Sequence, residues 1–363
     1  MALAVALFVV VAACSGPRTQ RADVDQAAVE RERQLQAELA LNALYDHTRR
    51  LADVAFAIRH NAAALCGTAT EAYFGLSVQT RHAFEAPMRR AAETLFAADD
   101  RLRVWTVAAG SPAGRAGLLP GDVIMSVNDT EIPSGTAAIS TFIGALDAYS
   151  SDTGDGPVSV VFDRADVGLR RAEMVPVTAC AYPAELLVSD EINAFADGQH
   201  IVVTTGMMNF LRDDTELATI VGHELAHNVM GHVEARQTNA LGGLFFDLLA
   251  AGLGVNTQGA FSQMAAQAYS QDFELEADYV GLYALALAGY DYERAPNIWR
   301  QIAILNPDSI TIGRSHPTTA ERFIGLENTV AELNQKIASG LPLEPEIKSG
   351  SGFGDGSANT NSR

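Results

Sequence analysis

The chain has 363 residues and a formal net charge of −19, from 25 basic and 44 acidic side chains. A chain of this length can bury more than one core, so we expect at least two domains. The acidic balance, without a run of lysine and arginine, argues against binding to nucleic acid or to anionic lipid through charge.

The N-terminal residues have the features of an exported lipoprotein. The apolar run over 1–13 is too short to span a bilayer and ends in small side chains, as signal peptides do. Its end, Val-Ala-Ala-Cys at 11–14, resembles a lipobox, which implies a signal peptide over 1–13 and lipidation of Cys14. We therefore expect a bacterial envelope protein on the periplasmic side, attached to the membrane by its lipid only. Ser15 leaves sorting to the outer membrane open, and we expect that membrane; the alternative is a buried apolar segment.

Residues 14–65 are charged, alanine-rich and helical in pattern, and they predict a spacer from the membrane or a helix that packs on a later domain. The other two cysteines, Cys66 and Cys180, flank the next module. Domain termini often lie close together, and an exported protein meets an oxidising compartment. We therefore predict a Cys66–Cys180 disulfide; the alternative is two separate buried thiols.

Residues 66–180 change in character. The segment 104–129 predicts a strand, a Gly/Pro turn, a short helix, a turn and a strand, and it resembles the core of a bacterial PDZ domain. Upstream, Tyr73, Phe74, Gly75 and Leu76 resemble the loop whose N–H groups bind a peptide's C-terminal carboxylate while the peptide adds a strand to the sheet. The alternative is that 73–76 is a core strand and the groove binds nothing. We also expect helices at 88–96 and 136–149, and strands at 158–162 and 172–178 around a 163–171 turn.

Residues 223–227 read His-Glu-Leu-Ala-His. Histidines four apart on a helix face the same way, so His223 and His227 can reach one metal, and Glu224 can reach a water on that metal. This arrangement activates water for attack on a peptide carbonyl. Apolar residues recur every three or four positions over 215–232, which predicts a mostly buried helix, with capping oxygens at 213–215. The alternative is a solvated pair of histidines.

A catalytic zinc site needs a third protein ligand. Residues 270–290 predict a helix ended by Gly289, on which Glu274 and Asp278 share a face and Glu276 points away. One of the pair would ligate zinc and the other would orient a histidine, although the spacing fits two exposed acids near a helix start equally well. His232, about 180° around the first helix from His223, is expected to be structural or to support a ligand.

The motif at 223–227, followed by Glu-Leu-Glu-Ala-Asp-Tyr-Val-Gly at 274–281, resembles the zinc metallopeptidases of the HtpX and CaaX prenyl protease type, peptidase family M48. It is most similar to their periplasmic lipoprotein branch. Residues 192–208 are similar to the strand pair before the family's active-site helix, and 315–322 to its H-P-x-x-x-x-R element. The resemblance implies one Zn²⁺ per subunit, bound by His223, His227 and Glu274, with Asp278 behind the ligands.

The same resemblance implies roles for residues around the metal. Glu224 would take the proton of the attacking water and pass it to the leaving amine. His316 and Arg322 would lie beside the zinc as candidate donors to the oxyanion. His316 could instead close the site as a fourth ligand or simply precede Pro317 at a helix start, and Arg322 could form a salt bridge.

Substrate is expected at the edge of the strand pair. Asn193, Ala194 and Phe195 are the residues that we expect to pair with an extended polypeptide through main-chain hydrogen bonds. His200 follows on the same strand pair and is not expected to be catalytic.

We therefore predict an α+β protein: a mainly helical HExxH zinc-peptidase domain with a small β-sheet at 181–340, plus a PDZ-like β-barrel module at 66–180. Residues 241–253 predict a flap or dimer surface, and the Gly/Ser/Asn-rich tail over 341–363 predicts disorder. The expected function is endopeptidase cleavage of misfolded or unassembled envelope proteins. Its partners would be unfolded or extended polypeptides, with the PDZ-like module binding C-terminal peptides or gating the site. The alternatives are a non-catalytic chaperone or assembly scaffold, and a maturase for one partner.

Overall fold

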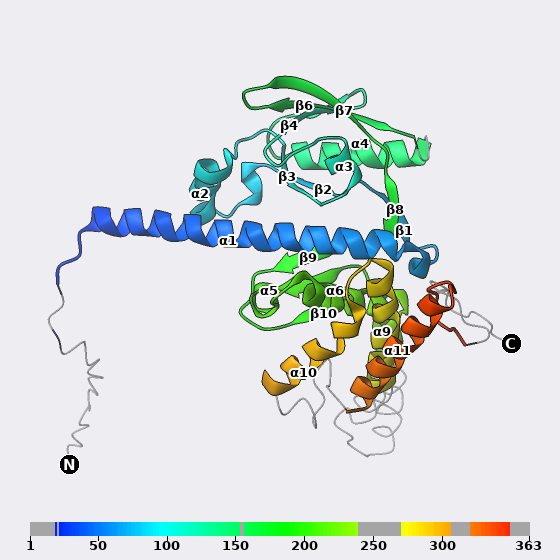
Figure 1. The fold of residues 1–363 in the computed structure, drawn as a ribbon. Coiled ribbons are helices and arrows are strands. Elements are labelled where there is room, and N and C mark those ends of the chain that lie inside the picture. The colour runs from blue at the N-terminus through cyan, green and yellow to red at the C-terminus, as the bar shows by residue number, and fades with distance from the viewer. Residues whose placement is uncertain (1–18, 20–21, 153–155, 239–269, 306–319, 349–363) are drawn as a thin grey trace, which may run out of the picture.

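The computed structural model of the chain describes residues 19, 22–152, 156–238, 270–305 and 320–348. Two modules lie on opposite sides of one long helix, α1 (Gln26–Asn61) (Figure 1). Within the described ranges, no helix combines the length and apolar character that a membrane span requires. The predicted signal peptide with Cys14, the 241–253 segment and His316 lie outside these ranges.

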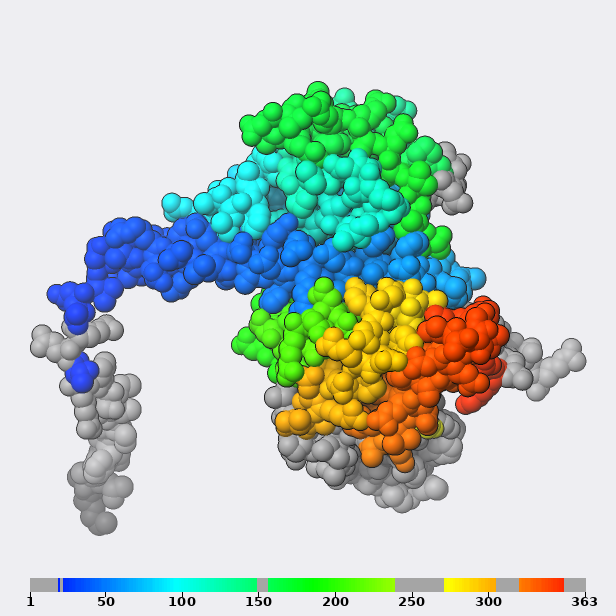
Figure 2. All heavy atoms as spheres, viewed as in Figure 1, coloured from blue at the N-terminus to red at the C-terminus, as the bar shows by residue number. Residues whose placement is uncertain are grey.

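Helix α1 is both the predicted spacer and a wall that the two modules share. It begins at Asp25, whose carboxylate accepts hydrogen bonds from the N–H groups of Ala27 and Ala28 at 3.2 and 3.1 Å. Its first turns are exposed, and the first buried side chain is Leu41. Figure 2 shows this N-terminal half projecting from the body of the molecule. The second half packs on the PDZ-like module through one side and on the peptidase-like module through the other.

The PDZ-like module is built on a sheet with the strand order β2-β3-β4-β6-β7. Alternate residues of β6 are buried, as a strand with one face on a core requires. Helix α4 packs on this core through Ala138 and Phe142. The elements are β1 (Thr70–Tyr73), β2 (Leu76–Gln79), α2 (Ala86–Phe96), β3 (Arg103–Val107), α3 (Pro112–Arg115), β4 (Val123–Val127), β5 (Thr130–Glu131), α4 (Ala138–Asp152), β6 (Val158–Arg164) and β7 (Gly168–Met174).

One predicted strand of this module divides into two. The sequence pattern predicted a single strand over 172–178, but β7 ends at Met174 and β8 (Val177–Cys180) pairs with β1 in a separate sheet. Pro176 lies between them and has no N–H for a ladder, which explains the break.

The β1–β8 pair is the neck between the modules. Thr70 lies opposite Cys180 in the antiparallel register, and Cys66, at the end of the short helix η1 (Ala63–Cys66), is joined to Cys180 by a disulfide with a Cα–Cα distance of 5.6 Å. Arg59 of α1 donates to the carbonyl oxygen of Cys180 at 2.9 Å and forms an ion pair with Glu71. Both chain connections of the PDZ-like module are therefore tied to α1.

The peptidase-like module places two helices unusually close together. A Cβ added at Gly281 of α9 would lie 3.1 Å from the backbone of His223 in α6, and one at Gly222 would lie 3.0 Å from the carbonyl oxygen of Gly281. The paired glycines thus bring the acids of α9 to the histidines of α6. The elements are β9 (Ala184–Leu187), β10 (Ala194–Ala196), β11 (Ile201–Thr204), α5 (Thr205–Phe210), α6 (Asp214–Val229), α9 (Ser270–Leu287), η3 (Tyr292–Arg294), α10 (Pro296–Leu305) and α11 (Ala320–Ala338).

The start of the C-terminal tail is ordered, contrary to the prediction of disorder from 341. Leu343 packs against the core, the N–H of Glu346 donates to the hydroxyl of Tyr279 at 2.9 Å, and Lys336 donates to the Glu346 carboxylate at 2.9 Å. Specific side chains on α9 and α11 explain this order, which composition does not reveal. With its helices and separate sheets, the structure confirms the predicted α+β class.

Candidate metal centre

Helix α6 carries the histidine motif and starts at a well-defined point. Asp213 accepts a hydrogen bond from the N–H of Glu216 at 3.0 Å, and the Glu216 carboxylate accepts one from the N–H of Arg212 at 2.7 Å. The first bond satisfies one of the free N–H groups of the first turn, and the second ties Glu216 to the residue before the cap. Every residue of α6 from Glu216 to Val229 is buried, and His223 and His227 are 2% and 4% exposed.

His223, His227 and Glu274 form one cluster of candidate metal ligands. The Nε2 atoms of the two histidines lie 3.1 Å apart, and each lies 3.4 Å from a different carboxylate oxygen of Glu274. Tetrahedral zinc with bonds of about 2.0–2.1 Å places its ligand atoms about 3.3 Å apart. The buried donor set and its spacing therefore fit Zn²⁺.

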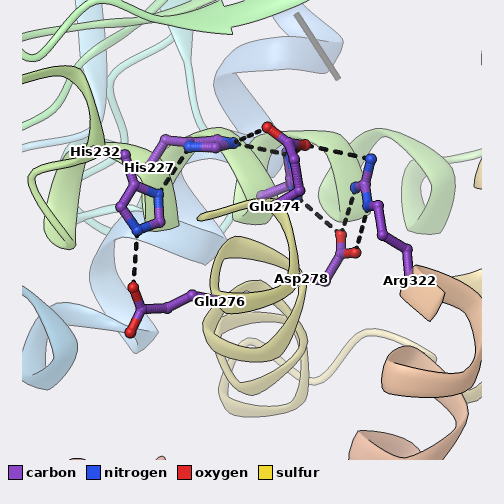
Figure 3. Close-up of polar contacts among 7 residues, drawn as sticks. His227, His232, Glu274, Glu276, Asp278 and Arg322 are labelled. Carbon is purple, nitrogen blue, oxygen red and sulfur yellow. Dashed lines mark hydrogen bonds and ion pairs between the residues drawn. The ribbon is translucent and has the colours of Figure 1, made fainter. Parts of the chain in front are cut away.

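The first histidine, His223, is supported from behind by Asp278, which Arg322 binds in turn; Figure 3 shows the contact between Asp278 and Arg322. Asp278 lies 3.1 Å from Nδ1 of His223 and accepts two hydrogen bonds of 2.7 Å from Arg322. Burial disfavours the charged forms of both His223 and Asp278. Even so, in the metal-free protein the bonds to Asp278 and Glu274 raise the pKa of His223 to about 9, and Arg322 lowers the pKa of Asp278. An ionised Asp278 at this distance favours a proton on Nδ1 of His223, so that Nε2 is the atom that would bind a metal.

The second histidine is supported by His232, which agrees with one of the two roles predicted for that residue. Nδ1 of His232 lies 2.9 Å from Nδ1 of His227, and Nε2 of His232 lies 3.0 Å from the carboxylate of Glu276 (Figure 3). Burial lowers the pKa of His227 to about 4, so its imidazole is neutral near pH 7. Each histidine of the cluster is thus oriented by a chain of two further side chains.

The helical angle predicted for His232 needs correction, whereas the predicted direction of Glu276 agrees with the structure. The helical angle assigned to His232 does not apply, because α6 ends at Val229 and Gly231, with φ +66°, turns the chain back toward His227. Glu276 does point away from the ligand face of α9, but it reaches His232 there. Gly231, two residues after Val229, is a sequence signal for the end of a helix, whereas the contact with Glu276, 44 residues away along the chain, has none.

Glu224 and Arg322 lie in the same buried region. Glu224 is 2% exposed and close enough for its charge to act on both His227 and Arg322. The Arg322 guanidinium bonds Asp278, lies 3.3 Å from Glu274 and stacks 4.2 Å above the Trp299 ring. These contacts are those of the predicted salt bridge; donation to an oxyanion stays a prediction.

Strand β10 is the outer strand of a sheet with the order β10-β11-β9, and it packs on α6. Asn193 accepts a bond from the Thr204 N–H, and at the far end the Asp197 N–H donates to the carbonyl of His200. Antiparallel bonding alternates, so the backbone groups of Ala194 and Ala196 face away from β11. No strand of the described chain pairs with that edge.

The predicted edge residues are therefore placed differently. The backbone groups of Asn193 and Phe195 face β11, whereas those of Ala194 and Ala196 face away from it. Ala194 is only 4% exposed and Ala196 is partly exposed, so Ala196 is the more accessible of the two. The sequence of such a short strand does not reveal which backbone groups point to which of its two hydrogen-bonding edges. His200 lies in the β10–β11 turn beside Asp197, at 3.0 Å, and away from the metal ligands.

The residues predicted for the PDZ carboxylate loop lie at the edge strand β2. Tyr73 ends β1, Leu76 begins β2, and Gly75 between them has φ +68°. A Cβ on Gly75 would lie 2.3 Å from the Cβ of Ser111. With the present packing, therefore, only glycine fits at this position. A cavity of about 170 Å³ separates the loop from α4, lined by Glu71, Ala72, Tyr73, Phe74, Leu76, Ile143, Leu146 and Asp147.

Comparison with known proteins assigns both modules. The sequence profile of peptidase family M48 matches residues 165–330, and that of the PDZ domain matches residues 103–145. Mitochondrial metalloendopeptidase OMA1 of Arabidopsis thaliana is 37% identical over 150 residues, which are 38% of this chain and 30% of the relative. The OMA1 metalloendopeptidase of Danio rerio is 30% identical over 190 residues, 48% of this chain and 39% of the relative.

A bacterial protease is also similar to this chain. The beta-barrel assembly-enhancing protease of Yersinia pestis is 29% identical over 170 residues, 41% of this chain and 34% of the relative. The chain thus spans between 30% and 39% of the length of these three relatives. The buried His-His-Glu cluster lies inside the region that is similar to peptidase family M48, and the region similar to the PDZ domain precedes it in the chain.

Proposed function

We propose that the chain is a zinc-dependent metalloendopeptidase. The observation that carries the proposal is the buried cluster of His223, His227 and Glu274, with Glu224 on the same helix as the two histidines. When bound, zinc supplies a Lewis acid that polarises the scissile carbonyl and activates water. The names of the OMA1 relatives, which include the word metalloendopeptidase, support this assignment.

The chain's own residues prepare that chemistry. Asp278 and His232 accept or share the Nδ1 protons of the two histidines, so both Nε2 atoms point at one place. Glu224, buried beside them, is the group that takes a proton from the attacking water and delivers it to the leaving amine. A site that only binds metal has no use for such a base, which argues against a non-catalytic scaffold.

We infer that the substrates are unfolded or extended polypeptides. Ala194 and Ala196 offer backbone groups at an open strand edge next to α6, and main-chain bonds select extended shape rather than side chains. The name of the Yersinia pestis relative supports misfolded or unassembled envelope proteins as the substrate class. The lipid anchor at Cys14 and a periplasmic location complete this proposal, and the groove beside Gly75 would bind chain ends or gate access.

The test uses the full chain with zinc and an unfolded substrate such as casein. We expect Glu224→Gln to keep its zinc and to lose activity by about 10²–10⁴-fold, the usual contribution of a general base. Glu327→Gln is the matched control, because Glu327 is an exposed α11 residue paired with Arg300. Cleavage by Glu224→Gln at the wild-type rate would show the mechanism to be wrong, and an inactive wild type that still binds casein would favour the scaffold.

A further inference from the structure

Asn228, the residue after the candidate ligand His227, is 4% exposed and takes no part in the cluster. We propose that Asn228 is a positioning residue that sets the register between the open edge of β10 and the metal site. The inference rests on the proposed function, because it assigns the edge of β10 to the substrate.

Both polar atoms of the Asn228 side chain bind the β10–β11 turn. Its Oδ1 accepts a hydrogen bond from the N–H of Gly198 at 2.9 Å, and its Nδ2 donates to the carbonyl oxygen of His200 at 2.9 Å. Both partners are backbone atoms of the same turn. The amide therefore holds the turn in one position and one orientation on the last turn of α6.

The turn itself is stiff, so its position passes directly to the strand. The Asp197 carboxylate accepts hydrogen bonds from the N–H groups of Gln199 and His200 at 2.8 and 2.6 Å. Gly198 has φ +94°, and a Cβ there would lie 2.9 Å from a carboxylate oxygen of Glu234. Asp197 thus fixes the turn internally, while Asn228 fixes it against the helix that carries the ligands.

The other contacts between β10 and α6 restrain sliding less. Ala194 packs into the core that includes Leu217 and Leu225 of α6, and apolar packing keeps surfaces together without defining their position along the strand. The register matters because a strand rises about 3.3 Å per residue, so a shift of that size brings a neighbouring peptide bond to the metal. The directional bonds of Asn228 are what oppose such a shift.

Two substitutions separate the contributions of the amide. Asn228→Ala leaves the Gly198 N–H and the His200 carbonyl without this partner. Asn228→Asp keeps an acceptor for Gly198 but places a second oxygen against the His200 carbonyl. Asn334→Ala is the matched control, because both amide atoms of Asn334 are also bonded, to Tyr292 and Glu293, on α11.

The experiment compares the zinc-loaded full chains on casein and on a peptide that spans one mapped casein cut, with products identified by mass spectrometry. For Asn228→Ala we expect wild-type zinc content, a higher KM, a fall in kcat/KM of roughly 10- to 100-fold and new cuts at neighbouring bonds. Asn228→Asp should show the same new cuts, and Asn334→Ala the wild-type pattern.

The inference is overturned if Asn228→Ala cuts the same bonds as the wild type with an unchanged KM, whatever its kcat. If Asn228→Ala does not fold, the same criteria apply to Asn228→Asp, which keeps one of the two bonds. Failure of the wild type and of Asn334→Ala to cut casein would instead contradict the proposed function, so the two ideas fail in different ways.

Discussion

Replacing Arg322 tests how the metal site is held together. Arg322 is 1% exposed, binds Asp278 through two hydrogen bonds of 2.7 Å and lies 3.3 Å from Glu274. In Arg322→Gln, two buried carboxylates lose their cationic partner. Removing one partner from a buried ion pair costs about 3–5 kcal/mol in the free energy of unfolding.

That cost predicts two measurable effects. For a domain of 150–250 residues, each kcal/mol lowers Tm by about 2–4 °C, so Arg322→Gln should unfold on the order of 10 °C below the wild type. Asp278 would also lose the arginine that holds it behind His223, and loss of such support weakens metal binding by about 10- to 100-fold. The zinc affinity should therefore fall together with Tm.

The assay is thermal unfolding of the metal-free chain, together with zinc affinity measured against a competing chelator. Arg322→Lys keeps the charge but cannot make the two parallel bonds to Asp278, so its values should lie between those of Arg322→Gln and the wild type. Arg300→Gln is the control, because Arg300 is an exposed arginine paired with Glu327 at 2.8 Å, and such pairs contribute about 0–1 kcal/mol.

One result would refute this reasoning. If Arg322→Gln keeps the Tm and the zinc affinity of the wild type while kcat falls, Arg322 acts on the oxyanion of the reaction, the other role that the sequence suggested. A fall in Tm and zinc affinity with the remaining zinc-loaded fraction fully active supports the ion pair.

Two further predictions concern stability. The Cys66–Cys180 bridge closes a loop with a sequence separation of 114. Replacing both cysteines with serine should therefore lower the free energy of unfolding by about 5 kcal/mol, less any strain. Denaturant titration measures this change, and an unchanged midpoint would contradict the prediction. Burial raises the pKa of Asp213, but the Glu216 N–H and Arg294 lower it by more. A carboxylate whose pKa is lower in the folded chain than in the unfolded chain stabilises the fold at pH values above its ordinary pKa near about 4. That stabilisation is lost as the pH falls through the lowered pKa. Asp213→Asn should thus cost under about 1 kcal/mol at pH 7 and less as the pH falls through the lowered pKa, and a difference that grows in acid would count against this account.

The sequence was informative wherever helical geometry relates neighbouring residues. His223 and His227, and likewise Glu274 and Asp278, are four apart, so their shared direction follows from the helical repeat. The start of α6 was also readable, because Asp213 is a capping residue before an apolar run. These local rules, with the family resemblance, predicted the three candidate ligands and the acid behind them.

The sequence was uninformative where contacts depend on packing between distant segments. The support of His227 by His232 and Glu276 arises because α6 stops at Val229, which periodicity did not reveal. Asn228 had one signal, a polar amide in a run predicted to be buried, but its partners lie 30 and 28 residues away.

By itself, the sequence supplied the candidate donors, the candidate base and their spacing on each helix, since those follow from residue type and the 3.6-residue repeat. The choice of Glu274 rather than Asp278 as the third ligand came from the family resemblance. Only the tertiary structure decided how these parts meet. Gly222 and Gly281 let α6 and α9 approach until Glu274 faces both histidines. Hydrogen-bond alternation selects Ala194 and Ala196 as the open edge, and α1 joins both modules. Close packing and pairing register are properties of two segments together, and neither segment encodes them alone.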